Sequence, residues 1–326
     1  MDLLMDALRH PAVPPIEDAK VLFQRAAHLG RSNRFAEELA TYEEVVRRFA
    51  EANDVVLLQQ VAIALVNKGV RLGGLQQFDE ELVAYEEVVR RFGENTDLVL
   101  RQQVAKALNN KGGRLGAMRR FEEGLADCEE VLRRFGENSD VVLRQQVGIA
   151  LVNKGVRLAG LQRFDDELAA YEEVVRQFGE SDDLVLQRLA AIALVNKGGR
   201  LGGLQRFDEE LVAYEEVVRR FGENGDVVLQ QQVAKALNNK GGRLGAMQDR
   251  QAAEKSEHRT VLSGPKISCP LCEWMPRKGD VWLCSCGYQW DTFETGGVCP
   301  SCLKQWEIVA CLGCSRSSPH RDWYHY

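Results

Sequence analysis

The chain has 326 residues, of which 45% are apolar and 28% are charged, a composition typical of a globular protein with room for two modules. Its net charge of −6 argues against a general binder of nucleic acid or anionic membranes, because such proteins usually carry an excess of Lys and Arg. No run approaches about 18 uninterrupted apolar residues and the first residues lack the pattern of a signal peptide, so the sequence predicts no membrane span and a reducing, cytoplasmic setting.

Residues 1–14 contain Pro11 and Pro14, and we expect an N-terminal arm there rather than a continuous helix. From 15 to 247 the chain follows a 43-residue repeat, marked by two series of phenylalanines. These are Phe35, Phe78, Phe121, Phe164 and Phe207, and Phe49, Phe92, Phe135, Phe178 and Phe221. A fixed period of this size indicates a solenoid, because no single repeat can bury its apolar face alone.

Each repeat contains the patterns of two helices. Between Phe78 and Phe92, apolar residues recur at the three- and four-residue spacing of an amphipathic helix. Gly93 follows, and we expect it to end the helix in a left-handed conformation. Asp97 then stands where the second helix should begin, because a carboxylate there accepts hydrogen bonds from free backbone N–H groups. The predicted fold class is therefore an all-α solenoid of antiparallel helix pairs.

The second helix and its successor resemble the tetratricopeptide (TPR) repeat. Leu65, Gly69 and Leu72 have the spacing of W-x2-L-G-x2-Y, and Glu81 with Tyr85 has the spacing of the following A-x3-F. The resemblance covers the whole array and implies a groove that receives a protein partner. The period of 43 rather than 34, the missing closing proline and Glu81 in place of a small residue depart from that pattern.

An Asn and an Arg four residues apart recur on one face of each second helix. They are Asn67 and Arg71, Asn110 and Arg114, Asn153 and Arg157, Asn196 and Arg200, and Asn239 and Arg243. Stacking the repeats should align them into a polar ladder. One interpretation is that the ladder binds an acidic or extended peptide of a protein partner, and the other is that it forms a solvated face with hydrogen bonds between repeats.

Lys68 lies in the apolar stripe of the same helix, so its stem should pack among apolar groups. A buried ammonium needs a partner, and Glu38 occupies the facing position of the first helix. We hypothesise a repeated Lys–Glu pair between the helices. The alternative is that the lysine extends to water.

The repeat pattern decays after Met247, since Arg250 stands where the next phenylalanine would be. Residues 248–266 are polar and contain Ser-Gly-Pro, which indicates a degenerate capping helix and a linker. Residues 267–326 differ in composition and contain all five tryptophans and eight of the nine cysteines. The remaining cysteine, Cys128, replaces a tyrosine of the array, and we expect a small buried side chain there.

The eight clustered cysteines form four close pairs: Cys269 and Cys272, Cys284 and Cys286, Cys299 and Cys302, and Cys311 and Cys314. Two such pairs complete a tetrahedral thiolate site, so we predict two structural zinc ions with no open position for catalytic water. Disulfides, a redox motif and an iron–sulfur cluster are the alternatives. His320 and His325 lie outside the pairs and are expected at the surface.

The order of the pairs resembles a RING finger, the zinc module of ubiquitin ligases, in which positions such as Leu271 and Trp306 contact the ubiquitin-carrying enzyme. The string from Cys284 to Cys302 also resembles a zinc ribbon. The long gap between Cys286 and Cys299 departs from the RING pattern. Sequential, cross-braced and nested groupings of the pairs all remain open.

No set of catalytic residues stands out in the sequence. We therefore expect a scaffold whose array binds one protein and whose β-rich zinc module binds a second. The alternative is a RING-like ligase whose array selects the substrate. Nucleic-acid binding is disfavoured, because basic and acidic residues of the cysteine-rich segment balance before the thiolates are counted.

Overall fold

The computed structural model describes residues 15–262 and 266–325, and for residues 251–262 the helical backbone alone. The chain divides into two compact units, Met1–Arg243 and Leu244–Tyr326. The first is a helical array and the second contains the cysteine-rich segment.

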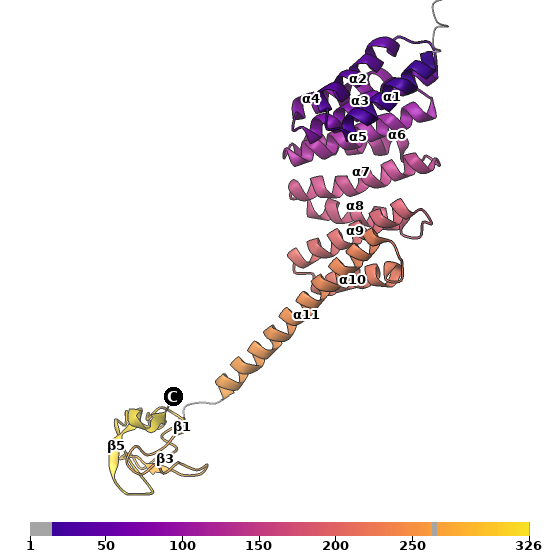
Figure 1. Cartoon of the computed structure of the whole chain (residues 1–326). Coiled ribbons are helices and arrows are strands. Elements are labelled where there is room, and N and C mark those ends of the chain that lie inside the picture. Colours follow the sequence, from indigo (N-terminus) through magenta and orange to yellow (C-terminus); the bar gives the residue numbers. More distant parts are fainter. Residues whose placement is uncertain (1–14, 263–265, 326) are drawn as a thin grey trace, which may run out of the picture. The chain divides into compact units, whose positions relative to one another are not determined.

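The array alternates short helices of 15 residues with long helices of 20 residues after one preceding helix (Figure 1). The preceding helix is α1 (Pro15–Arg31). The short helices are α2 (Phe35–Phe49), α4 (Phe78–Phe92), α6 (Phe121–Phe135), α8 (Phe164–Phe178) and α10 (Phe207–Phe221). The long helices are α3 (Val55–Gly74), α5 (Leu98–Ala117), α7 (Val141–Gly160), α9 (Leu184–Gly203) and the start of α11 (Val227–Leu262). The predicted solenoid of antiparallel helix pairs is confirmed.

Aromatic side chains of the short helices pack on glycines of the long helices that precede them. Tyr85 is buried, and its ring lies so close to Gly69 that a Cβ there would meet it at 2.5 Å. Gly155 with Tyr171 and Gly198 with Tyr214 show the same arrangement. The glycine of the TPR-like pattern is thus explained by close packing between consecutive repeats.

The aspartates expected to begin the long helices do cap them. Asp97 Oδ1 accepts a hydrogen bond from Leu100 N at 3.0 Å. The same oxygen accepts one from Gln59 Nε2 of the preceding long helix, also at 3.0 Å. This cap therefore stabilises a helix start and links two repeats, as do those of Asp140, Asp183 and Asp226.

The left-handed residue of each repeat lies at a different turn from the one we expected. Gly93 has φ −57° and ψ −34°, a right-handed helical conformation, so the prediction for this glycine is wrong. Gln76, after α3, has φ 62° instead. Gln77 N donates to Leu72 O at 2.9 Å and Gln76 N to Gly73 O at 3.1 Å, which is the Schellman arrangement. All five copies of this turn place a residue with a side chain there: Asn33, Gln76, Arg119, Gln162 and Gln205.

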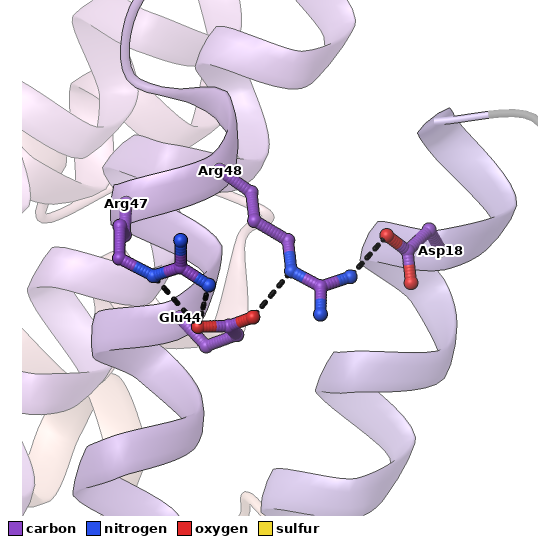
Figure 2. Close-up of polar contacts among 4 residues, drawn as sticks. All are labelled: Asp18, Glu44, Arg47 and Arg48. Carbon is purple, nitrogen blue, oxygen red and sulfur yellow. Dashed lines mark hydrogen bonds and ion pairs between the residues drawn. The ribbon is translucent and has the colours of Figure 1, made fainter.

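An arginine joins α1 to α2 at the start of the array (Figure 2). Arg48 Nη1 lies 2.6 Å from Asp18 Oδ2 on α1, while its Nε contacts Glu44. Glu44 also accepts from Arg47, and hydrogen bonds from Arg47 and Arg48 lower its pKa. These groups are largely solvated, so apolar burial around Leu22 and Ala26 contributes more to the contact.

By length and composition alone, α3 is apolar enough to cross a membrane. Its buried residues Leu57, Val61 and Leu65 pack with neighbouring helices in the array core. Packing between repeats accounts for this apolar composition.

No break in the helix marks the end of the repeat pattern at Met247, because α11 runs continuously to Leu262. Leu237 and Leu244 are 51% and 41% exposed, whereas their copies Leu108 and Leu115 are buried. The sequence gives a reason, because polar residues from Arg250 onward replace the apolar pattern of the short helix that follows each earlier long helix.

The cysteine-rich segment consists of short antiparallel strand pairs. Strand β1 (Lys266–Ile267) pairs with β6 (Tyr324–His325), β2 (Trp282–Leu283) with β3 (Gln289–Trp290), and β4 (Ile308–Ala310) with β5 (Ser317–Pro319). A 3-10 turn, His320–Trp323, precedes β6. Two small cores form, one around Trp282 and Trp323 and one around Trp290, and each contains cysteines. The predicted β-rich module is confirmed.

Candidate metal centres and the polar face of the repeats

The eight clustered cysteines gather into two groups of four. One comprises Cys269, Cys272, Cys311 and Cys314, and the other comprises Cys284, Cys286, Cys299 and Cys302. Within each group all sulfurs lie within 4.8 Å of one another. The first pair thus joins the last, and the second joins the third. Of the three groupings that the sequence left open, the structure has the nested one.

All four pairs lie in similar tight turns, and the turn of the second pair is one residue shorter. Cys269 O accepts from Glu273 N at 2.8 Å, and the corresponding bonds occur at Gly287, Leu303 and Ser315. The residue after the second cysteine has a positive φ in every case: 59° at Glu273, 89° at Gly287, 60° at Leu303 and 57° at Ser315. This turn directs both sulfurs of a pair to the same side, so each pair offers two ligand atoms.

Backbone N–H groups point at several of the sulfurs. Leu271 N lies 3.4 Å from Cys269 Sγ, and Gly313 N lies 3.3 Å from Cys311 Sγ. The N–H of Cys286 lowers the pKa of Cys284 to about 6, and that of Arg316 lowers the pKa of Cys314 to about 6. Four clustered sulfurs, some favoured as thiolates, form a donor set suited to a soft or borderline metal ion.

Each sulfur group is packed against tryptophan. Trp274 lies against Gly313, where a Cβ would be 2.6 Å from the indole ring. Trp290 and Trp306 meet edge to face with ring centroids 5.2 Å apart, beside Cys284 and Cys299. The aromatic residues therefore build the small cores that hold the cysteine turns in place.

Several residues of the RING-like interpretation lie differently from what that resemblance implies. A RING finger would cross-brace the first pair with the third, and the observed grouping does not. Leu271 is 44% exposed, whereas Trp306 is half-buried against Trp290. His320 is buried, and its Nε2 lies 3.1 Å from Thr292 O, so the prediction of a surface position for it is wrong.

In the array, the arginines of the polar ladder bind glutamates of the same repeat. Arg114 pairs with Glu81 and lies over the Phe78 ring, 4.2 Å from its centroid. The same arrangement joins Arg71 to Glu38, Arg200 to Glu167 and Arg243 to Glu210. The asparagines of these repeats bond to tyrosine, as Asn239 Nδ2 does to Tyr214 OH at 3.2 Å.

The predicted Lys–Glu pair is wrong in its partners, because arginine takes the glutamate that we assigned to lysine. Lys68 Nζ instead lies 2.8 Å from the more exposed Glu43, and Lys240 Nζ lies 2.8 Å from Glu215. The lysine stem crosses the apolar stripe and its ammonium reaches a solvated carboxylate. The geometry combines the two sequence interpretations, a pair and an extension toward water.

A groove of about 660 Å³ runs across α3, α5 and α7. Its lining includes Asn110, Arg114 and Asn153 of the ladder, together with Lys106 and Gln146. Part of the predicted ladder thus lines a groove, and partner binding by these residues stays a prediction. We recognised the repeated glutamates from the sequence but assigned them to lysine, whereas four of the ladder arginines bind them.

No protein-family model and no curated protein matches the sequence. Among solved structures, the MamA RS-1 ArsTM double mutant is similar with a TM-score of 0.46 and 14% identity, covering 64% of this chain and 97% of that chain. A crystallised engineered protein has a TM-score of 0.44 and 14% identity, covering 71% and 93%. A tetratricopeptide repeat protein from Parabacteroides merdae ATCC 43184 has a TM-score of 0.22 and 11% identity, covering 68% and 99%. All three TM-scores are below 0.5, so the architecture of this chain is assigned from its own helix pairs and not from these similarities.

Proposed function

We propose that this chain is a protein–protein interaction scaffold, in which the helical array binds one partner and the cysteine module binds another. The observation that carries the proposal is the groove of about 660 Å³ across three long helices, lined by polar side chains from successive repeats. A surface built from repeated helices suits an extended protein segment better than a small molecule.

We propose that each group of four cysteines holds a structural zinc ion. Four sulfurs complete a tetrahedral site, so a metal bound there has no open position for a water or a substrate. Zinc would supply folding free energy to a segment whose own cores are small. Metal analysis of the purified chain tests this, with two zinc ions expected per chain and a colourless protein. Iron with visible absorption would overturn the zinc assignment.

The module also offers a place for a second partner. A cleft of about 910 Å³ is lined by Phe293, Trp306, His320 and Tyr324. Aromatic side chains at a cleft are typical of interface anchors. We therefore propose Trp306, and with it the exposed Leu271, as contacts for the second partner. The nested grouping removes the cross-brace on which the RING-like ligase alternative depended.

We further propose a reducing, cytoplasmic setting, because two four-thiolate sites require reduced cysteines. The scaffold proposal is tested by affinity capture with the intact chain beside a version ending at Leu262. Array partners should be retained by both, and module partners only by the intact chain. A Trp306→Ala variant with two bound zinc ions should lose only the second set. Equal capture of every protein by both chains would contradict a role for the module in binding.

A further inference from the structure

The third repeat differs from the other four at the positions that complete the polar ladder. Its short helix α6 has Gly124, Asp127 and Cys128 where α4 has Glu81, Ala84 and Tyr85. Its long helix α7 nevertheless retains Asn153 and Arg157. The repeat has therefore lost the internal partners of the ladder but kept the ladder itself.

Arg157 is left as a buried cation without a counterion. The residue is 7% exposed, its buried Nε has no hydrogen-bond partner, and no carboxylate of the described residues forms an ion pair with it. Asp127 does not serve as its partner, because that carboxylate lies 3.3 Å from Lys111 Nζ. The neighbouring Cys128 thiol stays neutral, since burial raises its pKa to about 12. A buried charge without a counterion is energetically costly. Binding of a carboxylate that can reach Arg157 is therefore favoured.

The guanidinium of Arg157 lies where the other repeats place a glutamate. A Cβ on Gly116 would be 2.0 Å from Arg157 Cζ. At the corresponding Gly73, a Cβ would be 2.6 Å from Glu81 Oε2. The site next to this glycine thus holds a planar charged group, which is a carboxylate at Gly30, Gly73 and Gly202.

Asn153 has also lost its partner. In the other repeats, the corresponding asparagine bonds the tyrosine hydroxyl of the preceding short helix: Asn67 to Tyr42, Asn110 to Tyr85, Asn196 to Tyr171 and Asn239 to Tyr214. Cys128 has no hydroxyl to offer. Asn153 stands one helical turn before Arg157 and lines the groove that crosses α3, α5 and α7.

The charge of that groove favours an acidic guest. Lys106 is exposed along it, Asn109 and Gln146 add neutral polar groups, and its one acidic lining residue, Glu81, is already paired with Arg114. No carboxylate lining the groove would repel an incoming one except this neutralised glutamate.

We infer that Arg157 and Asn153 receive an acidic side chain of the protein partner, whose carboxylate takes the part that Glu81 plays for Arg114. This inference rests on the proposed scaffold function and names the recognition point within the array. Arg157 packs at Gly116 and does not itself line the groove, so binding requires its long side chain to turn toward Asn153, whose amide then donates to the second carboxylate oxygen. The other four repeats satisfy their arginines internally, so binding is confined to the third.

The test measures binding of fluorescein-labelled hexaglutamate to the intact zinc-loaded chain by fluorescence anisotropy. Arg157→Met should weaken binding at least tenfold, whereas the matched Arg200→Met, which alters an internally paired arginine, should change it less than twofold. Labelled hexaglutamine is expected not to bind. Sodium sulfate at matched ionic strength should compete less well than sodium glutamate if a carboxylate is preferred.

A second variant restores the pattern of the other repeats. Gly124→Glu combined with Cys128→Tyr should give Arg157 and Asn153 their internal partners and abolish hexaglutamate binding, with helical content retained by circular dichroism. A Cβ on Gly124 would be 2.9 Å from Gly112 O on α5, so the two helices must separate slightly. Cys128→Tyr is included because a tyrosine occupies this helix interface in the other repeats, as Tyr85 does at Gly69. Undiminished binding in this double variant, or equal losses in Arg157→Met and Arg200→Met, would overturn the inference.

Failure here is distinguishable from failure of the scaffold proposal. If the truncated array still captures partners but Arg157→Met retains them all and binds hexaglutamate normally, the recognition point is wrong and the scaffold stands. If the array captures nothing, the scaffold proposal fails, and hexaglutamate binding still decides whether Arg157 accepts a carboxylate.

Discussion

Arg200 Nε on α9 lies 2.6 Å from Glu167 Oε2 on α8, and the glutamate is 3% exposed. The pair joins the two helices of one repeat, and the same guanidinium lies over the Phe164 ring. Burial raises the pKa of Glu167 despite the hydrogen bond from arginine. The third repeat lacks this glutamate, which makes the comparison between Arg200 and Arg157 informative.

We predict opposite effects from removing the two arginines. Arg200→Met leaves Glu167 as an unpaired buried carboxylate and should cost about 3 kcal/mol of unfolding free energy. Arg157→Met removes a buried charge that has no partner, so it should stabilise the array by about 1 kcal/mol. Urea titrations followed by circular dichroism measure both. Equal destabilisation by the two variants would show that Arg157 has a compensating partner.

Asp127 should make the array more stable in mild acid. Burial raises its pKa from 3.8 to about 6, although Lys111 opposes the shift and Glu86 and Glu123 add to it. The folded chain then binds more protons than the unfolded chain between pH 4 and 6, so stability falls as pH rises through this window. The full effect is roughly 3 kcal/mol at most.

The matched variant Asp127→Asn removes this titration. Its unfolding free energy relative to the native chain should therefore increase from pH 4 to pH 7, because only the native chain loses the contribution of protonated Asp127 over that range. Thermal melts at several pH values provide the measurement. A constant difference across the range would mean that Asp127 titrates normally.

Glycine should be preferred at the left-handed turn after each long helix. Gln76 has φ 62°, where a side chain costs on the order of 1 kcal/mol. Gln76→Gly should therefore raise the unfolding midpoint. Gln77→Gly, at a φ of −88°, is the control and should lower it slightly, because glycine adds entropy to the unfolded chain. The prediction fails if both variants destabilise the array equally.

Removing metal should unfold the cysteine module and spare the array. A strong chelator is expected to shift tryptophan fluorescence, because all five tryptophans lie in the module, while helical circular dichroism is largely unchanged. Cys269→Ser should reduce metal content, whereas Cys128→Ser, in the array, should leave two ions bound. Full metal content in Cys269→Ser would exclude that cysteine as a ligand.

The sequence by itself determined the helix pairs and the cysteine turns, because both depend on local spacing. The 43-residue period, the capping aspartates and the glycines that face Tyr85 and its copies specify where the helices lie and how they stack. The close cysteine pairs specify four ligand-bearing turns. These features involve residues that are neighbours in the chain or in adjacent repeats.

Only the tertiary structure decided which partners those residues find. Lys68 and Arg71 share one helix face, and their spacing does not show which of them reaches Glu38; the path and length of the side chains give it to arginine. Four equivalent cysteine turns can be grouped in several ways, and the strand pairing between β1 and β6 brings the outer turns together. Contacts between segments distant in sequence depend on the folded path of the chain, which local patterns do not contain.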